Sequence, residues 1–183
     1  SGAYYHERRI GYRRGVQMNE ATTKVRLPAD PIATPANRAG DSTGILPSQK
    51  IKEMLKNGEI TRTLGLIDDD QVQPASIDLR LGECAYPVDT SFLPGKEMRV
   101  LEKMKQLDGR FDSFKIDLRQ GAVLEKGRIY VIPLLETINL RSDVAAFANP
   151  KSSTGRLDIL TRLIADGATV FDQVIEGYRG ELY

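Results

Sequence analysis

Apolar and polar residues alternate in several short segments of this chain, which is the pattern of strands that bury one face. The clearest case is residues 76–82, where Ile77, Leu79 and Leu81 alternate with polar or small residues. Further strands are expected at residues 114–118, around Val123, and at residues 129–132, 137–140, 167–172 and 178–183. Because these patterns recur at roughly 8–12-residue spacing, they favour a barrel or sandwich over a parallel sheet with crossover helices.

Two short amphipathic helices interrupt the strand patterns. The first is predicted from an N-cap at Ser48, with Ile51 and Met54 on its buried face. The second is predicted over residues 97–107, where Met98, Leu101 and Met104 recur at helical spacing. The chain is therefore expected to be mainly β with short helices.

The first 43 residues have a different character. They hold few apolar clusters and end in a stretch rich in proline, alanine and glycine that begins at Pro28. Residues 1–43 are thus expected to form a flexible N-terminal arm, and residues 44–183 the folded domain. Four arginines near the start make a nucleic-acid contact conceivable, but so few charges favour a solvated arm. The predicted last strand stops abruptly at Tyr183, so the domain is expected to be incomplete at its C-terminal end.

The segment Asn149-Pro150-Lys151-Ser152-Ser153-Thr154-Gly155-Arg156 concentrates hydroxyls and positive charge. Pro150 disfavours helix at the preceding residue. The apolar residues that follow at roughly helical spacing are Leu157, Ile159, Leu160, Leu163 and Ile164. We therefore expect a loop that enters a helix, with Ser152 or Ser153 near the N-cap. Free N–H groups beside Lys151 and Arg156 would suit a phosphate, although an ordinary serine-capped helix with two solvated basic residues explains the same sequence.

Composition removes several classes of chemistry. Lys and Arg number 26 against 25 Asp and Glu, so the net charge of +1 gives no global attraction to nucleic acid or to a membrane. No segment is long and apolar enough to span a bilayer. The single cysteine, Cys84, fits a reducing cytoplasm. The one histidine, His6, lies in the expected arm, so the His-x-Glu…Pro-Cys-x-x-Cys pattern of zinc deaminases cannot be built from this sequence, and a Ser-His-Asp triad is not expected. Carboxylates, hydroxyls, guanidinium groups, backbone groups or bound water must carry any reaction.

Three motifs together resemble the dCTP deaminase family. They are Gln73-Pro74-Ala75-Ser76-Ile77-Asp78-Leu79-Arg80-Leu81-Gly82, Pro150-Lys151-Ser152-Ser153-Thr154-Gly155-Arg156-Leu157, and Asp172 followed by Gly177-Tyr178-Arg179-Gly180-Glu181. The resemblance covers about residues 44–183 and is closest to the long, two-domain bacterial form. It implies a dUTPase-like fold, which is a distorted β-barrel of the β-clip type, usually assembled as a homotrimer with sites between subunits.

The resemblance also implies a function in pyrimidine deoxyribonucleotide synthesis. Members of the family deaminate dCTP to dUTP and ammonia without zinc, so the attacking water must be held by hydrogen bonds and deprotonated by a side-chain base. The family's water-holding groups match the Ser152 hydroxyl and the carbonyl of Ala168, which is placed four residues before Asp172. The family's base-orienting guanidinium matches Arg156.

The substrate contacts follow from the same resemblance. The triphosphate would be held by Lys151, Ser153 and the backbone of Thr154 and Gly155, with Mg²⁺ carried by the triphosphate and no metal bound by the protein itself. Asp172 would accept a hydrogen bond from the deoxyribose 3′-hydroxyl. Tyr178 and Tyr183 complete the predicted substrate-binding set.

Two departures from the family pattern bear on these assignments. The segments on either side of Asp172 each run about three residues longer than in the short members of the family. The family's catalytic glutamate would fall two residues after Tyr183. Glu181 shares that strand face but lies four residues short of the position. The sequence as given is therefore expected to be inactive or incomplete by itself.

Three alternative functions stay open. Tyr178-Arg179-Gly180-Glu181 is also typical of dUTP diphosphatases, in which Asp172 would act through a water that attacks phosphorus. The chain could carry that activity alone or together with deamination. It could also be a non-catalytic nucleotide-binding module, or bind nucleic acid through its basic arm.

Overall fold

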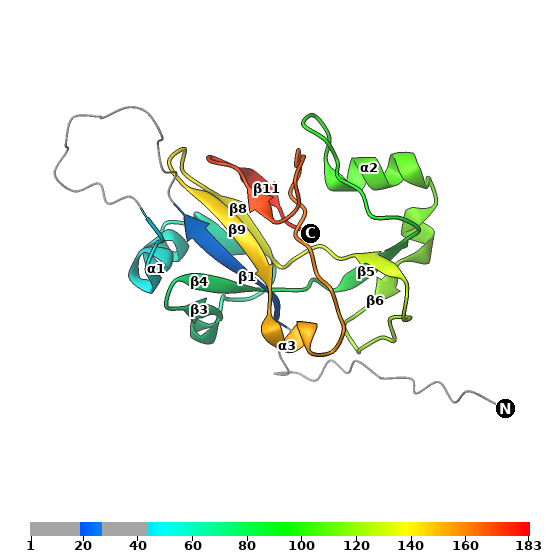
Figure 1. The fold of residues 1–183 in the computed structure, drawn as a ribbon, viewed down its shortest axis with the longest axis horizontal. Coiled ribbons are helices and arrows are strands. Elements are labelled where there is room, and N and C mark those ends of the chain that lie inside the picture. Colours follow the sequence, from blue (N-terminus) through cyan, green and yellow to red (C-terminus); the bar gives the residue numbers. More distant parts are fainter. Residues whose placement is uncertain (1–18, 27–43) are drawn as a thin grey trace.

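The computed structural model describes residues 19–26 and 44–183, whose strands form three small antiparallel sheets (Figure 1). The largest has the strand order β10-β9-β1-β4-β3, and the other two have the orders β11-β8-β2 and β6-β5-β7. The strands are β1 (Asn19–Arg26), β2 (Ile60–Arg62), β3 (Val72–Gln73), β4 (Ser76–Arg80), β5 (Cys84–Val88), β6 (Ile116–Asp117), β7 (Ile129–Val131), β8 (Glu136–Asn139), β9 (Ala145–Pro150), β10 (Gln173–Val174) and β11 (Arg179–Glu181). The helices are α1 (Ser48–Lys56), α2 (Val100–Leu107) and α3 (Ser152–Gly155), with single 3₁₀ turns η1 (Asp69–Gln71) and η2 (Phe111–Phe114). The predicted class, mainly β with short helices, is confirmed, although the described strands do not close into one barrel.

Strand β1 corrects the predicted boundary of the N-terminal arm. Residues 19–26 lie in the middle of the largest sheet, where Thr22 is opposite both Asp78 of β4 and Asn149 of β9. A central strand is held through backbone hydrogen bonds to two neighbours, so it forms without the apolar alternation on which the prediction relied. The remainder of the predicted arm, residues 1–18 and 27–43, lies outside the described residues.

The first two helices confirm their predictions and the third does not. Helix α1 begins at Ser48 with Pro47 as its N-cap, one residue before the predicted cap, and α2 covers most of the predicted range. Helix α3, in contrast, ends at Gly155, and the chain then turns through Asp158, whose φ of 56° lies in the left-handed region. Leu160, which the helical pattern placed on a buried face, is 91% exposed. The helix predicted over the following apolar run is therefore wrong: Leu157 and Leu160 are exposed, and Leu163 and Ile164 enter the two core clusters from a segment that is not helical.

Two loop and strand predictions are also corrected. The predicted strand at residues 167–172 is absent from the described chain, because Gly167 and Asp172 have φ values of 72° and 62° that a strand does not allow. No strand was predicted between residues 82 and 114, yet this segment contains β5. The expected strands at residues 76–82, 129–132, 137–140 and 178–183 correspond to β4, β7, β8 and β11.

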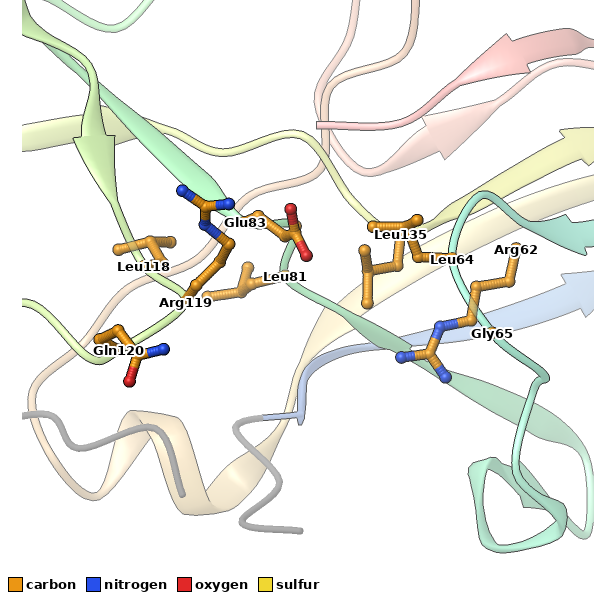
Figure 2. A pocket seen from close by; sticks show the side chains of 10 residues that line it. Arg62, Leu64, Gly65, Leu81, Glu83, Leu118, Arg119, Gln120 and Leu135 are labelled. Carbon is orange, nitrogen blue, oxygen red and sulfur yellow. The ribbon is translucent and has the colours of Figure 1, made fainter. Parts of the chain in front are cut away.

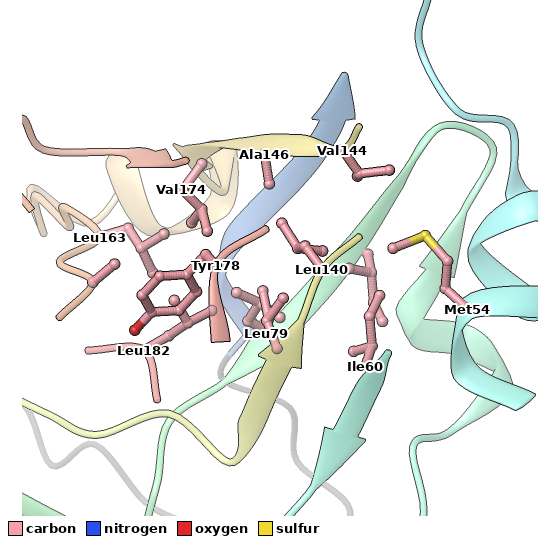
Figure 3. Close-up of a cluster of buried hydrophobic side chains, with 14 of the residues drawn as sticks. Met54, Ile60, Leu79, Leu140, Val144, Ala146, Leu163, Val174, Tyr178 and Leu182 are labelled. Carbon is pink, nitrogen blue, oxygen red and sulfur yellow. The ribbon is translucent and has the colours of Figure 1, made fainter. Parts of the chain in front are cut away.

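Two hydrophobic clusters form the core. The first lies between the large sheet, α1 and the β11-β8-β2 sheet, with Leu79, Leu140 and Leu182 almost fully buried (Figure 3). The second lies between β5, β7 and α2. Tyr178 belongs to the first cluster and Tyr183 to the second, so the last described segment joins the two. Among the described helices, none has the length and apolar character needed to cross a membrane.

One buried polar network ties β8 to β4. Glu136 is 0% exposed and accepts hydrogen bonds from the Arg80 backbone N–H (2.8 Å) and from Gln71 Nε2 (2.9 Å). Gln71 Nε2 also donates to the carbonyl of Asp78 at 2.8 Å. Burial raises the pKa of the Glu136 carboxyl above its usual value, against the effect of these donors.

Candidate functional site

The basic, hydroxyl-rich segment lies at the end of strand β9. The strand ends at Pro150, Lys151 precedes α3, and the backbone N–H of Thr154 donates to the Lys151 carbonyl at 3.0 Å. Ser152, Ser153 and Arg156 are exposed, whereas Thr154 is buried. The N-cap residue is Lys151, and Ser152 directly follows it, so the serines lie near the N-cap as predicted although neither is the capping residue. A helix of four residues has little dipole, so the positive character of this surface comes from Lys151 and Arg156.

Lys151 is held by a carboxylate from another strand. Its Nζ lies 2.7 Å from Oδ2 of Asp78, whose side chain is 3% exposed while that of Lys151 is 34% exposed. The strand order explains the contact, because β1 separates β9 from β4 and a lysine side chain is long enough to reach across one strand. The Lys151 ammonium is therefore fixed at the surface with one side available to solvent.

Asp172 is brought next to β9 by its backbone. Its carbonyl accepts from the N–H of Ala148, and its φ of 62° turns the chain at this point. Its Oδ1 accepts from the backbone N–H of Leu163 at 2.8 Å, and its Oδ2 pairs with the guanidinium of Arg162 at 2.5 Å. The Arg162 guanidinium also lies 5.1 Å from the centroid of the Phe171 ring. The fold thus brings Asp172 and the Ser152 segment to the same strand.

Ala168 lies in a tightly turned loop. Its N–H donates to the carbonyl of Ala165, and its own carbonyl accepts from the backbone N–H of Gly95, both at 3.1 Å. Its side chain packs against the first core cluster. One lone pair of the carbonyl that the family resemblance assigns to the water is therefore already used, and one stays available.

Tyr178 and Tyr183 are both buried. The Tyr178 hydroxyl donates to the carbonyl of Glu181 and accepts from the backbone N–H of Asp166 at 3.1 Å. Burial raises the pKa of Tyr178 to about 12. The Tyr183 hydroxyl donates to Oε2 of Glu181 at 2.7 Å. Both rings support the core of the described chain, and their contact with substrate stays a prediction.

A cavity of about 900 Å³ lies away from these residues, between the end of β2 and the segments that precede β5 and follow β6 (Figure 2). It is lined by Arg62, Leu64, Gly65, Leu81, Gly82, Glu83, Leu118, Arg119, Gln120 and Leu135. No predicted site residue is among them. The sequence gives no indication of this cavity, because its lining comes from loops that are far apart along the chain.

Metal-binding residues were not predicted for the protein itself. In the part of the chain that the structure describes, no three His, Cys, Asp or Glu side chains gather in a way that could hold a metal ion. The expectation that Mg²⁺ arrives with the triphosphate is a statement about the substrate, and it stays a prediction.

Comparison with known proteins identifies the family. Residues 42–183 match the family described as the 2′-deoxycytidine 5′-triphosphate deaminase (DCD) N-terminal domain. A "dCTP deaminase, dUMP-forming" of Persephonella marina is 31% identical over 117 residues, covering 63% of this chain and 59% of the relative. A protein of the same name from Dictyoglomus thermophilum is 32% identical over 130 residues, covering 66% of this chain and 60% of the relative.

A solved structure gives the same result. The chain resembles the crystal structure of 2′-deoxycytidine 5′-triphosphate deaminase from Agrobacterium tumefaciens with a TM-score of 0.71 and 48% identity, over 78% of this chain and 41% of that one. The similarity confirms the predicted dUTPase-like fold class. The chain spans about three fifths of the length of the two curated relatives and about two fifths of the Agrobacterium chain. On the family match and this structural similarity, the chain belongs to the family of the 2′-deoxycytidine 5′-triphosphate deaminase N-terminal domain.

Proposed function

We propose that the full-length protein to which this domain belongs deaminates dCTP hydrolytically, releasing ammonia and forming dUTP. The observation that carries the proposal is the exposure of Ser152 and Arg156 just past the end of β9, the strand whose Ala148 N–H donates to the Asp172 carbonyl, in a chain whose residues 42–183 match the deaminase family. A hydroxyl, a guanidinium and a carboxylate there provide a water-holding group, a base-orienting cation and a sugar acceptor.

The reaction assigns one step to each group. The Ser152 hydroxyl and the Ala168 carbonyl hold a water whose oxygen forms the new bond to C4 of the cytosine ring. The bond from C4 to the exocyclic nitrogen then breaks, and that nitrogen leaves as ammonia after taking up one proton of the water, while the other proton goes to N3 of the ring. Arg156 orients the ring and stabilises negative charge that develops on it. No zinc is needed in this scheme, since a hydrogen-bonded water and a side-chain base replace it. The family resemblance assigns that base to a glutamate two residues after Tyr183.

The triphosphate is the second part of the recognised substrate. Lys151, Ser153 and the backbone of Thr154 and Gly155 bind it, and Mg²⁺ enters bound to the triphosphate. Asp172 accepts from the deoxyribose 3′-hydroxyl. The ion pair between Lys151 and Asp78 supports the assignment of the triphosphate to this segment, because it holds the ammonium at the surface next to the hydroxyls of α3.

A second candidate activity is hydrolysis of the dUTP product to dUMP and diphosphate. It is favoured by the relatives from Persephonella marina and Dictyoglomus thermophilum, which are both described as dUMP-forming. In that case a second water attacks phosphorus after deamination, with Asp172 acting through that water.

The test measures ammonia and diphosphate separately, with dCTP and then dUTP offered to the full-length protein. Deamination alone predicts ammonia from dCTP and no diphosphate from either nucleotide. The bifunctional enzyme releases both from dCTP. A diphosphatase releases only diphosphate, and from dUTP. Nucleotide binding with neither product would overturn the enzymatic proposal and favour a non-catalytic binding module.

We also propose that the site is completed by further copies of this chain, in a homotrimer. Large apolar side chains are exposed on both sides of α3 along the sequence, and exposed apolar surface of this kind is typical of interfaces. They are Phe147 (38% exposed), Leu157 (58%), Leu160 (91%), Val170 (49%) and Ile175 (71%). Because Ser152 and Arg156 are exposed in the single chain, a second copy could cover a nucleotide bound there. Sedimentation would give the stoichiometry, and a monomer at micromolar concentration would contradict the proposal.

A cytoplasmic location is proposed from the single cysteine.

A further inference from the structure

The loop that carries Ala168 is fastened to the segment before α2 by three hydrogen bonds. Gly95 N–H donates to the Ala168 carbonyl at 3.1 Å, and Gly167 N–H donates to the Met98 carbonyl at 2.9 Å. The third bond runs from the backbone N–H of Val100 to Oδ1 of Asp166 at 2.7 Å. Residues 95–100 and residues 166–168 thus act as one unit, although they are far apart in sequence.

The two segments also approach each other closely. Gly167 has a φ of 72°, and a Cβ placed on it would lie 3.2 Å from the Lys96 carbonyl oxygen. The two backbones therefore approach so closely at Gly167 that a side chain would be crowded there, which leaves little freedom for either segment to shift alone. The direction of the Ala168 carbonyl therefore depends on where residues 95–100 are held.

Asp166 is the residue that connects this unit to the core. Its carboxylate accepts from the first N–H of α2, while its own N–H donates to the hydroxyl of Tyr178 at 3.1 Å. Tyr178 is 7% exposed and belongs to the first core cluster, and its hydroxyl donates in turn to the Glu181 carbonyl of β11. One residue thereby joins the start of α2 to the packed centre of the domain.

We propose that Asp166 is a positioning residue for the hydrolytic step: by holding the start of α2 it fixes Gly95, and through Gly95 it aims the Ala168 carbonyl at the attacking water. This inference depends on the proposed deaminase function, since the carbonyl matters only if it holds that water. Asp166 itself does not contact substrate.

The first test compares two caps of the same helix. Glu102 Oε2 accepts from the Arg99 backbone N–H at 3.3 Å, so it also supports the start of α2 but makes no hydrogen bond to residues 166–168. In the full-length protein, Asp166→Ala should lower kcat for dCTP on the order of 100-fold with KM changed far less, because a small displacement of a positioned group is costly. Glu102→Ala should lose comparable thermal stability and keep kcat. Asp166→Asn retains an acceptor for Val100 N–H and should restore most of kcat.

The result that overturns the proposal is a wild-type kcat for Asp166→Ala, or an equal loss of kcat in Asp166→Ala and Glu102→Ala, which would mean that helix capping alone matters. If the wild-type protein releases no ammonia from dCTP, the proposed function fails instead, so the two failures are distinguishable.

A second pair of variants keeps the proposal testable if Asp166→Ala does not fold. Gly167→Ala forces a Cβ against Lys96, whereas Gly127→Ala introduces the same strain at a φ of 80° with no atom within 4 Å. Both should destabilise the fold to a similar degree. Only Gly167→Ala should lower kcat by more than its loss of folded protein explains; equal kcat values for the two folded variants would refute the coupling between residues 95–100 and the carbonyl.

Discussion

The substitution Asp172→Asn separates the structural role of this residue from its proposed contact with the sugar. Asn retains an oxygen that accepts from the Leu163 N–H, and it tolerates the positive φ of this position better than most residues. What it loses is the ion pair with Arg162, whose side chain is 58% exposed. An exposed pair contributes about 0–1 kcal/mol, so the free energy of unfolding should fall by about 1 kcal/mol or less.

The effect on substrate should be larger and specific to one hydroxyl. A hydrogen bond to a charged group contributes roughly 1.5–3 kcal/mol and a neutral one roughly 0.5–1.5 kcal/mol. Replacing the carboxylate with an amide should therefore cost about 1.4 kcal/mol, or about 10-fold in kcat/KM. This loss should appear with dCTP and be absent with 2′,3′-dideoxy-CTP, which has no 3′-hydroxyl to donate.

The assay is the ratio of kcat/KM for dCTP to that for the dideoxy analogue, in wild type and variant. We expect the ratio to fall about 10-fold in Asp172→Asn. Arg162→Ala is the matched control, because it breaks the same ion pair from the other side and leaves the carboxylate in place, no longer shared with a guanidinium, so its ratio should stay at or rise above the wild-type value. A folded Asp172→Asn protein that discriminates between the two nucleotides as wild type does would refute the sugar contact.

Three further variants test other parts of the site and core. Ser152→Ala removes an exposed hydroxyl, so it should leave the melting temperature unchanged and lower kcat by about 100-fold or more; normal ammonia release would disprove its role. Lys151→Ala should raise KM for dCTP, and because it also breaks the ion pair with Asp78 it should lower the melting temperature; an unchanged KM counts against phosphate binding. Glu136→Gln tests the buried carboxyl. Its pKa is raised in the folded state above 4.5, so the folded protein holds the proton more strongly than the unfolded chain. Wild type should therefore lose stability relative to Glu136→Gln as the pH rises above 4.5, by at most about 1.4 kcal/mol per pH unit. Urea unfolding from pH 4 to 8 measures this difference, which a flat profile would contradict.

The sequence predicted those elements whose side chains alternate between core and solvent or follow one helix face. β8 and α1 are examples, since the spacing of their buried residues is enough to identify the one as a strand and the other as a helix. β1 was not predicted because backbone hydrogen bonds to β4 and β9 hold it in the sheet, and such bonds leave no pattern of apolar and polar side chains in the sequence. The helix expected after Gly155 failed for the opposite reason: Leu157 and Leu160 have helical spacing, but the fold provides no surface for them to cover.

In the candidate site, too, local features could be predicted from the sequence and long-range contacts could not. The motif at residues 151–156 was recognised because its charged and hydroxyl groups lie within a few consecutive residues. The ion pair between Lys151 and Asp78 joins residues 73 positions apart, and the bond between Val100 and Asp166 joins residues 66 positions apart. Contacts of this kind depend on strand order and loop path, so a single sequence contains no direct trace of them.

The ion pairs of the proposed substrate-binding residues determine how a nucleotide would bind. Lys151 is paired with Asp78, and Asp172 is paired with Arg162. A triphosphate that approaches Lys151 therefore meets an ammonium already shared with a buried carboxylate, and a 3′-hydroxyl that reaches Asp172 shares it with a guanidinium. A nucleotide that binds Lys151 and Asp172 must replace or share the ion pairs that these residues already make. Each new contact therefore contributes less to affinity than a contact with a solvated ion would. The ion pairs favour binding in another way, because they fix both side chains before the nucleotide arrives, so less side-chain entropy is lost on binding. Fixed side chains also orient the nucleotide, and a hydrolytic step at one ring carbon requires precise placement more than tight binding.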